Sequence, residues 1–424
     1  MQGYNPCRVI FSIFVSNICP MSPSVTQKAF TPFQLRNLTL RNRFIKTAAN
    51  EGMIRNGLPS AQLVEHHRRI AQGGIAMTTV AYGAVHPDGR THEVQMYMRP
   101  EVVPGLKALT DAVHKEGAFA SIQLTHCGFF TNNRLVTGKR PIAPSRIINN
   151  YGLLSGIFMS REMTTADCRL LAADFANSAR LAIEAGFDAV ELHMGHGYLL
   201  SQFLSPKFNR RKDEYGGSLA NRLRFPLEVV AAVRKAVGEE VPVICKTNLS
   251  DGIRGGLDID ESVLVARALE AEGVDALVLS GGLTSKTPFY LMRGDVPLKH
   301  MIRAEKQIQH KAAFAVFGRF IIGKYEFTEN FFLPLAVQIR QAVKMPLIYL
   351  GGIVSAPGVN QVMDAGFDLM AIGRALIHDP DFILRVAKDP NHLSPCNHCN
   401  ICVAEMDRQG VKCVLSPDQL SIFA

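Results

Sequence analysis

Short apolar runs rich in β-branched residues recur through most of the chain. Runs of this length, bounded by glycine, proline or polar residues, are typical of strands buried on both faces of a parallel sheet. The pattern therefore predicts strands at 43–49, 74–85, 119–126, 188–194, 241–249, 275–282, 346–353 and 369–376.

Segments with helical periodicity separate these runs. The clearest is 164–186, where Thr164 and Asp167 form a capping pair before the apolar positions and Gly186 follows the last of them. The other expected helices are 61–72, 101–116, 219–237, 260–272, 330–344 and 356–365.

The alternation of strands and helices predicts an α/β fold, a (β/α)8 TIM barrel. A doubly wound sheet is the competitor, but the Gly-x-Gly-x-x-Gly turn expected after its first strand does not follow 43–49. We expect the barrel to span 30–390, after a disordered or over-extended N-terminus at 1–29 and before a Cys-rich extension at 391–424. Segment 283–329 is too long for a simple loop and is expected to form a rim excursion with helical content, as a lid or partner surface.

The composition limits the classes of partner. The chain has 424 residues, 47% of them hydrophobic, and a formal net charge of +9. Lysine and arginine are spread out and their densest cluster, 209–212, is short, which is not the pattern of a nucleic-acid binder. No apolar run reaches the roughly 20 residues of a membrane span, and the short patch at 9–15 only weakly resembles a targeting segment. We therefore expect small-molecule substrates, no nucleic-acid or membrane partner, and a homo-oligomer as an open alternative.

Nine cysteines are present, and four of them crowd near the C-terminus. The arrangement differs from the disulfide framework of a small secreted domain, so we expect a reducing, cytoplasmic setting. The terminal group, C-x2-C-x2-C-x10-C, has a spacing that suggests an iron–sulfur or zinc site, and a metal-free group stays an alternative. Its members are Cys396, Cys399, Cys402 and Cys413.

Polar side chains stand near the carboxyl ends of three expected strands. His193 ends the fourth strand, His196 and Tyr198 follow in its loop, and Gln123 and Lys246 lie in the third and fifth strands. Because active sites of such barrels lie at this end, we expect the five side chains to converge there. Two histidines three residues apart can bind a metal or a substrate, but a zinc site needs three or four ligands and no carboxylate stands at a matching spacing.

Glycines end the last two expected strands. Gly351 and Gly352 lie at the end of the seventh strand, and Gly373 with Arg374 lies in the eighth. Glycine lets a backbone approach a ligand closely, and exposed N–H groups with a forked arginine donor suit a phosphate. Ordinary tight turns are the alternative. Phosphate sites after strands seven and eight recur in this barrel, so we expect one here.

The block HMGHGYLLSQFLSPKFNRRKDEYGGSLANRLRF, residues 193–225, resembles the signature of the Old Yellow Enzyme family, the FMN-dependent ene-reductases. In that family a strand end carries His-x-x-His/Asn-Gly-Tyr, followed by Phe-Leu-Ser-Pro and Asp-Glu-Tyr-Gly-Gly-Ser. The resemblance extends from about Phe30 to Arg385 and implies a (β/α)8 barrel with FMN across its mouth. The terminal cysteines resemble the cluster-binding stretch of larger relatives such as 2,4-dienoyl-CoA reductase, in which the middle spacing is one residue longer.

The resemblance implies a role for each matched residue. His193 and His196 would hydrogen-bond a substrate oxygen, and Tyr198 would donate a proton. Gln123 would bond the flavin pyrimidine, and Lys246 stands where many relatives place arginine beside the ring. The other implied FMN contacts are Ala48, Ala49 and Ala81 at the ring and Gly351, Gly352, Gly373 and Arg374 at the phosphate.

These residue types suit hydride transfer from flavin N5 to an activated alkene, a quinone or a nitro compound. Two imidazole donors can stabilise negative charge on the substrate oxygen as an oxyanion hole does, and a phenol can supply the proton. NADH or NADPH is the implied electron donor. Two alternatives stay open: a metal-dependent barrel hydrolase that uses the histidine pair, and a non-catalytic redox sensor that responds through its terminal cysteines.

Overall fold

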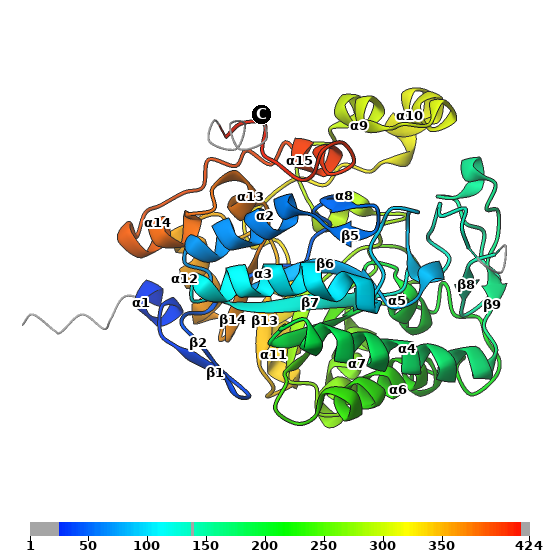
Figure 1. Ribbon diagram of the computed structural model, residues 1–424, viewed down its shortest axis with the longest axis horizontal. Coiled ribbons are helices and arrows are strands. Elements are labelled where there is room, and N and C mark those ends of the chain that lie inside the picture. Colours follow the sequence, from blue (N-terminus) through cyan, green and yellow to red (C-terminus); the bar gives the residue numbers. More distant parts are fainter. Residues whose placement is uncertain (1–24, 137–139, 417–424) are drawn as a thin grey trace, which may run out of the picture.

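Eight parallel strands close into a barrel in the computed structural model, which describes residues 25–136 and 140–416 (Figure 1). Each strand pairs in parallel with the next, and the last pairs with the first. The fold confirms the predicted (β/α)8 barrel. In order around the barrel the strands are β3 (Phe44–Lys46), β6 (Met77–Ala84), β7 (Phe119–Thr125), β10 (Ala189–Met194), β11 (Val243–Asn248), β12 (Ala276–Ser280), β13 (Leu347–Tyr349) and β14 (Leu369–Ile372).

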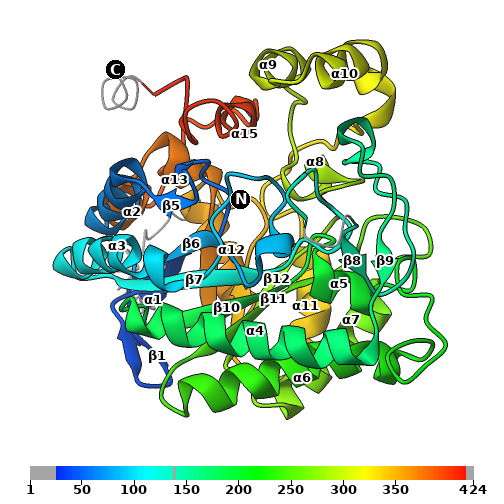
Figure 2. The same ribbon diagram turned by 45° about the vertical axis from the view of Figure 1, so that its right-hand side comes forward.

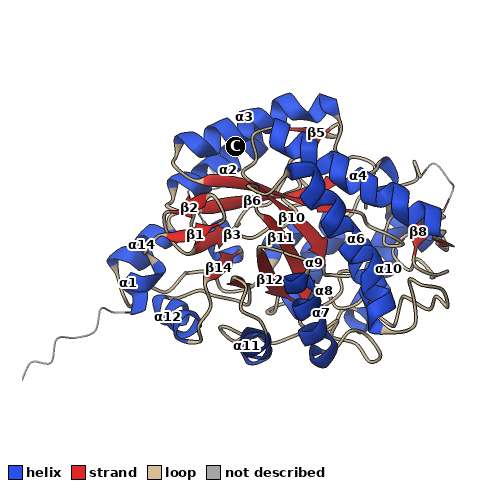
Figure 3. Cartoon of the chain, turned by 90° about the horizontal axis from the view of Figure 1, so that it is seen from below, coloured by secondary structure: helices blue, strands red, loops and turns tan. Residues whose placement is uncertain are grey.

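Helices surround the strands as an outer layer (Figure 3). The longest is α4 (Thr165–Glu184), which begins with the expected capping box between Thr164 and Asp167 and is followed by Gly186 at a φ of +85°. The other helices of this layer are α2 (Ala61–Gln72), α3 (Val103–Lys115), α6 (Leu219–Val237), α7 (Ile259–Ala271), α11 (Leu333–Ala342), α12 (Ala356–Asp364), α13 (Arg374–His378) and α14 (Phe382–Lys388).

Alternation along the strands divides the core into two parts. Val190 and Leu192 of β10 belong to the large apolar core between strands and helices, whereas Ala189 packs with residues of other strands inside the barrel. A hairpin of β1 (Phe33–Leu35) and β2 (Leu38–Leu40) contributes its leucines to this inner cluster. Because that cluster holds the first residues of the strands, the hairpin closes the amino end and leaves the carboxyl end for the site.

The eighth strand is shorter than predicted. We expected a strand over 369–376, but β14 ends at Ile372, and Arg374 begins helix α13. Gly373 interrupts the strand with a ψ of −98°, which is outside the extended range, and its carbonyl accepts the backbone N–H of Leu376. The apolar run at 369–376 therefore covers two elements, strand β14 and the first turn of helix α13.

Two segments extend beyond the carboxyl end of the barrel (Figures 1 and 2). Segment 283–329 contains α8 (Pro288–Leu291) and a projecting hairpin of α9 (Leu298–Ala304) and α10 (Ile308–Ile321). The C-terminal segment carries α15 (Ile401–Glu405), which packs against α9. The remaining elements are α1 (Val25–Ala29), β4 (Ile54–Arg55), β5 (Leu58–Pro59), β8 (Ile142–Ala143), β9 (Arg161–Glu162) and α5 (Leu199–Leu204).

None of the helices in the described ranges is long and apolar enough to cross a membrane. The apolar patch at 9–15, considered above as a targeting segment, lies outside the residues that the structure describes.

Candidate active site

The inner face of the barrel becomes polar toward its carboxyl end. Register pairs Glu191 of β10 with Gln123 of β7, and His193 of β10 with Lys246 of β11. All four side chains are buried. Glu191 and His193 share a strand face because they are two residues apart, so the polar layer follows directly from the strand period.

A carboxylate holds two of the expected flavin contacts together. Glu191 accepts a 2.6 Å hydrogen bond from the Gln123 amide and lies 2.9 Å from the Lys246 ammonium. Lys246 also donates to Thr47 Oγ1 at 3.2 Å and to the Ala48 carbonyl at 3.4 Å. Burying a charge is costly unless it is paired and hydrogen-bonded, and this arrangement meets both conditions for Lys246.

The loop after β10 presents His196 through an unusual backbone conformation. His196 has a φ of +57°, and Gly197 follows at +79°. The Asn248 side chain accepts the His196 N–H at 3.0 Å, and the Gly197 N–H donates to Ser201 at 3.2 Å. These bonds fix the loop, so His196 returns over the strand end toward His193, with ring centroids 5.0 Å apart.

His193 lies at the centre of the site. Its ring centroid is 4.4 Å from that of Tyr198, and within the described ranges its Nδ1 atom is buried without a hydrogen-bond partner. Burial, with smaller contributions from the charges of His196 and Lys246, lowers the pKa of His193 well below its ordinary value. The imidazole is therefore neutral, and its free nitrogen is available to a ligand.

His196 is held by a residue that the sequence analysis missed. Its Nε2 atom shares a 2.7 Å hydrogen bond with the hydroxyl of Ser280, at the end of β12. Burial and the nearby Lys246 charge lower the pKa of His196 to about 3, so this ring is neutral as well. A neutral imidazole has one N–H, and if the serine hydroxyl donates to Nε2, that N–H is on Nδ1.

Tyr198 has a second tyrosine as its partner. Its hydroxyl donates to the hydroxyl of Tyr82 at 2.8 Å, and the rings meet edge to face at 5.5 Å. Burial raises the pKa of Tyr198 well above its ordinary value, and the contact with Tyr82 adds to the shift. The phenol therefore keeps its proton at neutral pH and can donate it. Tyr82 was also missed, although it directly follows Ala81 in the sequence.

A buried charged group supports the strand that carries Ala81. The Glu51 carboxylate pairs with the Lys46 ammonium and accepts the Ala81 N–H at 3.3 Å. His67 lies 3.5 Å away on the other side. Burial opposes the charge of Glu51, but Lys46 and His67 outweigh it and lower the pKa of Glu51 to about 2.

The structure brings most of the expected active-site and flavin-ring residues together at the barrel mouth and leaves Ala49 apart from them. His193, His196, Tyr198, Gln123 and Lys246 converge at the barrel mouth. Ala48 and Ala81 pack against Tyr198 and Tyr82, whereas Ala49 is exposed. Their roles toward a ligand stay predictions.

The two glycines after the seventh strand are closely packed, and a side chain at either position would collide with its neighbours. A Cβ on Gly351 would lie 2.2 Å from the Tyr349 hydroxyl, and one on Gly352, at φ +87°, would lie 2.7 Å from Phe331. The buried His193 and Lys246 side chains are compatible with a flat, polar cofactor such as FMN, whereas Gly351 and Gly352 pack against the protein's own side chains, and their expected contact with a phosphate stays a prediction.

Arg374 faces a different set of partners. One of its terminal nitrogens donates to the carbonyls of Met292 and Arg293, both at 2.7 Å, and to the side chain of Asn400 at 2.6 Å. The guanidinium thus ties the rim excursion to the C-terminal segment, and its expected contact with a phosphate stays a prediction.

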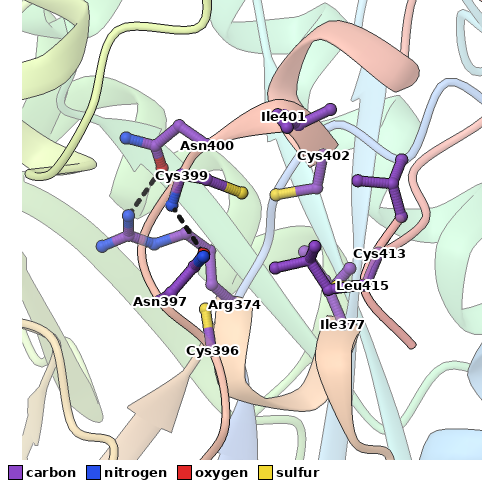
Figure 4. Close-up of a pocket in the computed structure, with 11 residues that line it drawn as sticks. Arg374, Ile377, Cys396, Asn397, Cys399, Asn400, Ile401, Cys402, Cys413 and Leu415 are labelled. Carbon is purple, nitrogen blue, oxygen red and sulfur yellow. Dashed lines mark hydrogen bonds between the residues drawn. The ribbon is translucent and has the colours of Figure 1, made fainter.

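The four terminal cysteines line one pocket with Arg374 and Asn400 (Figure 4). Burial raises the pKa of the Cys402 thiol to about 12, although the Arg374 charge opposes the shift. Within the described ranges, no three His, Cys, Asp or Glu side chains are arranged to hold a metal ion. The cysteines share a pocket but do not have the geometry of a formed cluster site, so the expected metal at Cys396, Cys399, Cys402 and Cys413 stays a prediction.

Comparisons with known proteins agree with this geometry. The family model described as "NADH:flavin oxidoreductase / NADH oxidase family" matches residues 28–283. A 4,4'-dithiodibutanoate disulfide reductase from Rhodococcus erythropolis is 42% identical over 93% of this chain and 96% of its own length. A metal reductase from Desulforamulus reducens is 33% identical over 88% of this chain, which spans only half of that protein. The solved structure of morphinone reductase with tetrahydroNAD superposes with a TM-score of 0.66 at 24% identity, over 87% of this chain and 92% of that one, and confirms the fold.

Proposed function

The chain belongs to the NADH:flavin oxidoreductase / NADH oxidase family and is an oxidoreductase that uses FMN and NADH or NADPH, and from this premise we propose that it reduces activated C=C bonds. The substrates would be small electrophiles that carry an oxygen beside the reacting carbon, such as enones, quinones or nitroalkenes. Family membership favours this reaction over the metal-dependent hydrolase and the non-catalytic sensor.

One observation carries the proposal. Among the residues that the structure describes, the buried Nδ1 atom of His193 has no hydrogen-bond partner, and its ring lies beside the protonated phenol of Tyr198, with ring centroids 4.4 Å apart. A buried polar atom without a partner costs free energy, and a substrate oxygen would satisfy it. The same substrate would then lie next to the proton donor that the reaction requires.

The histidines and Tyr198 have different roles in the proposed reaction. FMN, when bound, supplies the hydride. His193 and His196 stabilise the negative charge that develops on the substrate oxygen, because preorganised donors act most strongly in a buried site. Tyr198 donates its proton to the carbon beside the activating group, and the Tyr82 hydroxyl, 2.8 Å away, can rotate to hydrogen-bond the phenol oxygen as that proton leaves.

The charged layer below has a supporting role in this proposal. Lys246 supplies positive charge toward the electron-rich ring of a reduced flavin, and Gln123 offers an amide to its pyrimidine edge. Glu191 holds both side chains in position through its 2.6 Å and 2.9 Å contacts. Removing the Glu191 carboxylate would therefore weaken FMN binding more than it would slow proton donation by Tyr198.

The experiment uses the purified holoenzyme under anaerobic conditions. NADPH or NADH should bleach the flavin absorbance, and 2-cyclohexenone or a nitroalkene should restore it while the saturated product accumulates. Flavin that is reduced by the pyridine nucleotide but not reoxidised by any activated alkene would contradict the proposal.

Reduction of a disulfide is the second candidate, because the Rhodococcus erythropolis relative, 42% identical over nearly its whole length, is a 4,4'-dithiodibutanoate disulfide reductase. Hydride transfer to one sulfur breaks the S–S bond, giving one thiol and one thiolate, which takes a proton from solvent. A thiolate is a far better leaving group than a carbanion, with a thiol pKa of about 8.5. This reaction therefore depends less on Tyr198, and comparing reoxidation by 4,4'-dithiodibutanoate and by 2-cyclohexenone distinguishes the two candidates.

A further inference from the structure

Helix α10 packs against the rest of the protein along one narrow side. Only His310 and Gly318 of its residues are buried, and its main contacts are with α9, the other arm of the projecting hairpin. A Cβ on Gly318 would lie 2.6 Å from Leu298, so the two helices are in close contact at this point. The opposite side of α10 faces away from the barrel (Figure 2).

That opposite side is apolar. Ile308, Ala312, Val316 and Phe320 follow one another at intervals of four residues, so they form one stripe along the helix. Ile308 is 81% exposed and Phe320 is 88% exposed. Large apolar side chains exposed in a continuous stripe are unusual on the surface of a monomer and indicate an interaction surface.

The polar residues of the helix do not suit a lipid surface. Apart from Gln309 and Arg319, every exposed residue of α10 is apolar, and Lys311 is half-buried at the side. A helix that lies on a membrane has a strongly charged face opposite its apolar one, whereas the opposite side of α10 packs on α9. The exposed surface of α10 contains phenylalanine and arginine but no lysine, aspartate or glutamate. This is the composition of the core of a protein–protein interface.

The exposed area is close to what a dimer requires. With Phe317, which is 55% exposed, the large apolar side chains of the stripe present on the order of 500 Å2. A standard interface buries about 800 Å2 on each partner. Leu154 adds to this surface, because its carbonyl accepts a hydrogen bond from Gln309 at the N-terminal end of the stripe.

We propose that α10 is the surface on which a second copy of this chain docks, with the two α10 helices antiparallel across a two-fold axis. The stripe is complementary to itself in this orientation. An axis at the middle of the stripe places Ile308 opposite Phe320 of the other copy and Ala312 opposite Val316, so that small residues meet near the crossing point. The same axis places Arg319 opposite Gln309, and no two cations face each other.

The test is the oligomeric state of the full-length holoenzyme by sedimentation velocity from nanomolar to micromolar concentrations. The wild-type chain should form dimers. Phe320→Glu should weaken the dimer at least about a hundredfold, because a charge would replace the largest apolar side chain of the stripe and would be buried against Ile308 of the other copy. Leu170→Glu, which changes a residue of α4 that is 68% exposed, is the matched control and should leave the dimer intact. Unchanged flavin absorbance and circular dichroism verify the fold of each variant.

Cross-linking tests the orientation. Oxidation of a variant that carries both Ile308→Cys and Phe320→Cys should give a covalent dimer with the 308–320 link identified by mass spectrometry. A chain that stays monomeric at every concentration overturns the proposal, as does a dimer that persists with Phe320→Glu. Phe320-dependent sedimentation with phosphatidylglycerol vesicles by a monomeric chain would also overturn it and identify lipid as the occupant.

Discussion

The barrel mouth and helix α10 depart in opposite directions from the usual distribution of side chains. The mouth buries Glu191 and Lys246 together with His193, whereas α10 exposes Phe320 and Ile308 to solvent. Both arrangements cost free energy, the first through desolvation of charge and the second through hydration of apolar surface.

The difference lies in how each cost is offset. At the mouth most of the buried groups satisfy one another, and within the described ranges His193 Nδ1 is one atom that keeps an unused hydrogen bond, which we propose a ligand makes. On α10 the described chain offers nothing that covers the stripe. A mouth substitution should therefore affect catalysis and folding, and an α10 substitution should affect association.

The largest expected effect comes from Tyr198→Phe. Removing the proton donor should lower the rate of enone reduction by about 10²- to 10⁴-fold, because protonation of carbon relies on general acid catalysis. Reduction of the flavin by the pyridine nucleotide should stay close to the wild-type rate, so stopped-flow measurement of both half-reactions is the appropriate assay.

Tyr151→Phe is the matched control for Tyr198→Phe. Tyr151 is a half-buried tyrosine nearby, but its hydroxyl bonds His92 at 3.0 Å instead of Tyr82. Equal losses in the two variants would show that Tyr198 acts through packing and not as a proton donor.

Lys246→Met should have the next largest effect, on the free energy of unfolding. It leaves the Glu191 carboxylate buried without its cation, a change that typically costs about 3–5 kcal/mol. Denaturant titration measures the loss. Adding Glu191→Gln to this variant should recover part of the stability, and a double variant that is no more stable than Lys246→Met would count against a direct pair.

We expect the free energy of unfolding to fall in acid because of the buried Glu51 carboxylate. A carboxyl whose pKa is lowered on folding contributes stability above its ordinary pKa of 4.5 and loses that contribution as pH falls toward about 2. The loss should be on the order of 3 kcal/mol. Unfolding measured from pH 6 to pH 2 should show it, and Glu51→Gln should flatten the dependence in that window.

Ser280→Ala should have a smaller effect on catalysis. The hydroxyl positions His196 and touches no reacting atom, so its loss should lower kcat/KM for an enone by about tenfold, the value of one hydrogen bond. Ser280→Thr keeps the hydroxyl and should recover activity. A loss of stability without a change in kcat would assign Ser280 a purely structural role.

Phe320→Glu should have the smallest effect on folding, and it completes the comparison with the mouth. At concentrations where the chain is monomeric, its free energy of unfolding should change by less than about 0.5 kcal/mol, because the side chain is already in water. A large loss would mean that α10 packs within its own chain in solution.

The features that the sequence predicted are those with local periodicity. Strand runs, helical spacing and the capping pair at Thr164 led to the barrel, and the His193–Tyr198 block led to the mouth. Glu191 was within reach of the same reasoning, because it lies two residues before His193 on one strand face. Ser280 lies within the strand predicted at 275–282, near its carboxyl end, and carried a comparable signal.

Other features depend on contacts that no local pattern contains. The bond between Tyr82 and Tyr198 joins residues 116 positions apart. Arg374 was expected at a phosphate, and its guanidinium meets Asn400 because the C-terminal segment folds back over the rim. The apolar period of α10 has the same appearance in sequence whether the stripe packs inward or faces solvent.

The backbone of His196 restricts what evolution or a designer can place there. A φ of +57° lies in the left-handed region, where asparagine, aspartate, glycine and histidine are the residues that fit without strain. Of these four, only histidine and asparagine keep a neutral N–H donor for a substrate oxygen. The backbone conformation therefore favours histidine or asparagine at this position. A saturation library at residue 196 that is selected for activity should converge on these two residues.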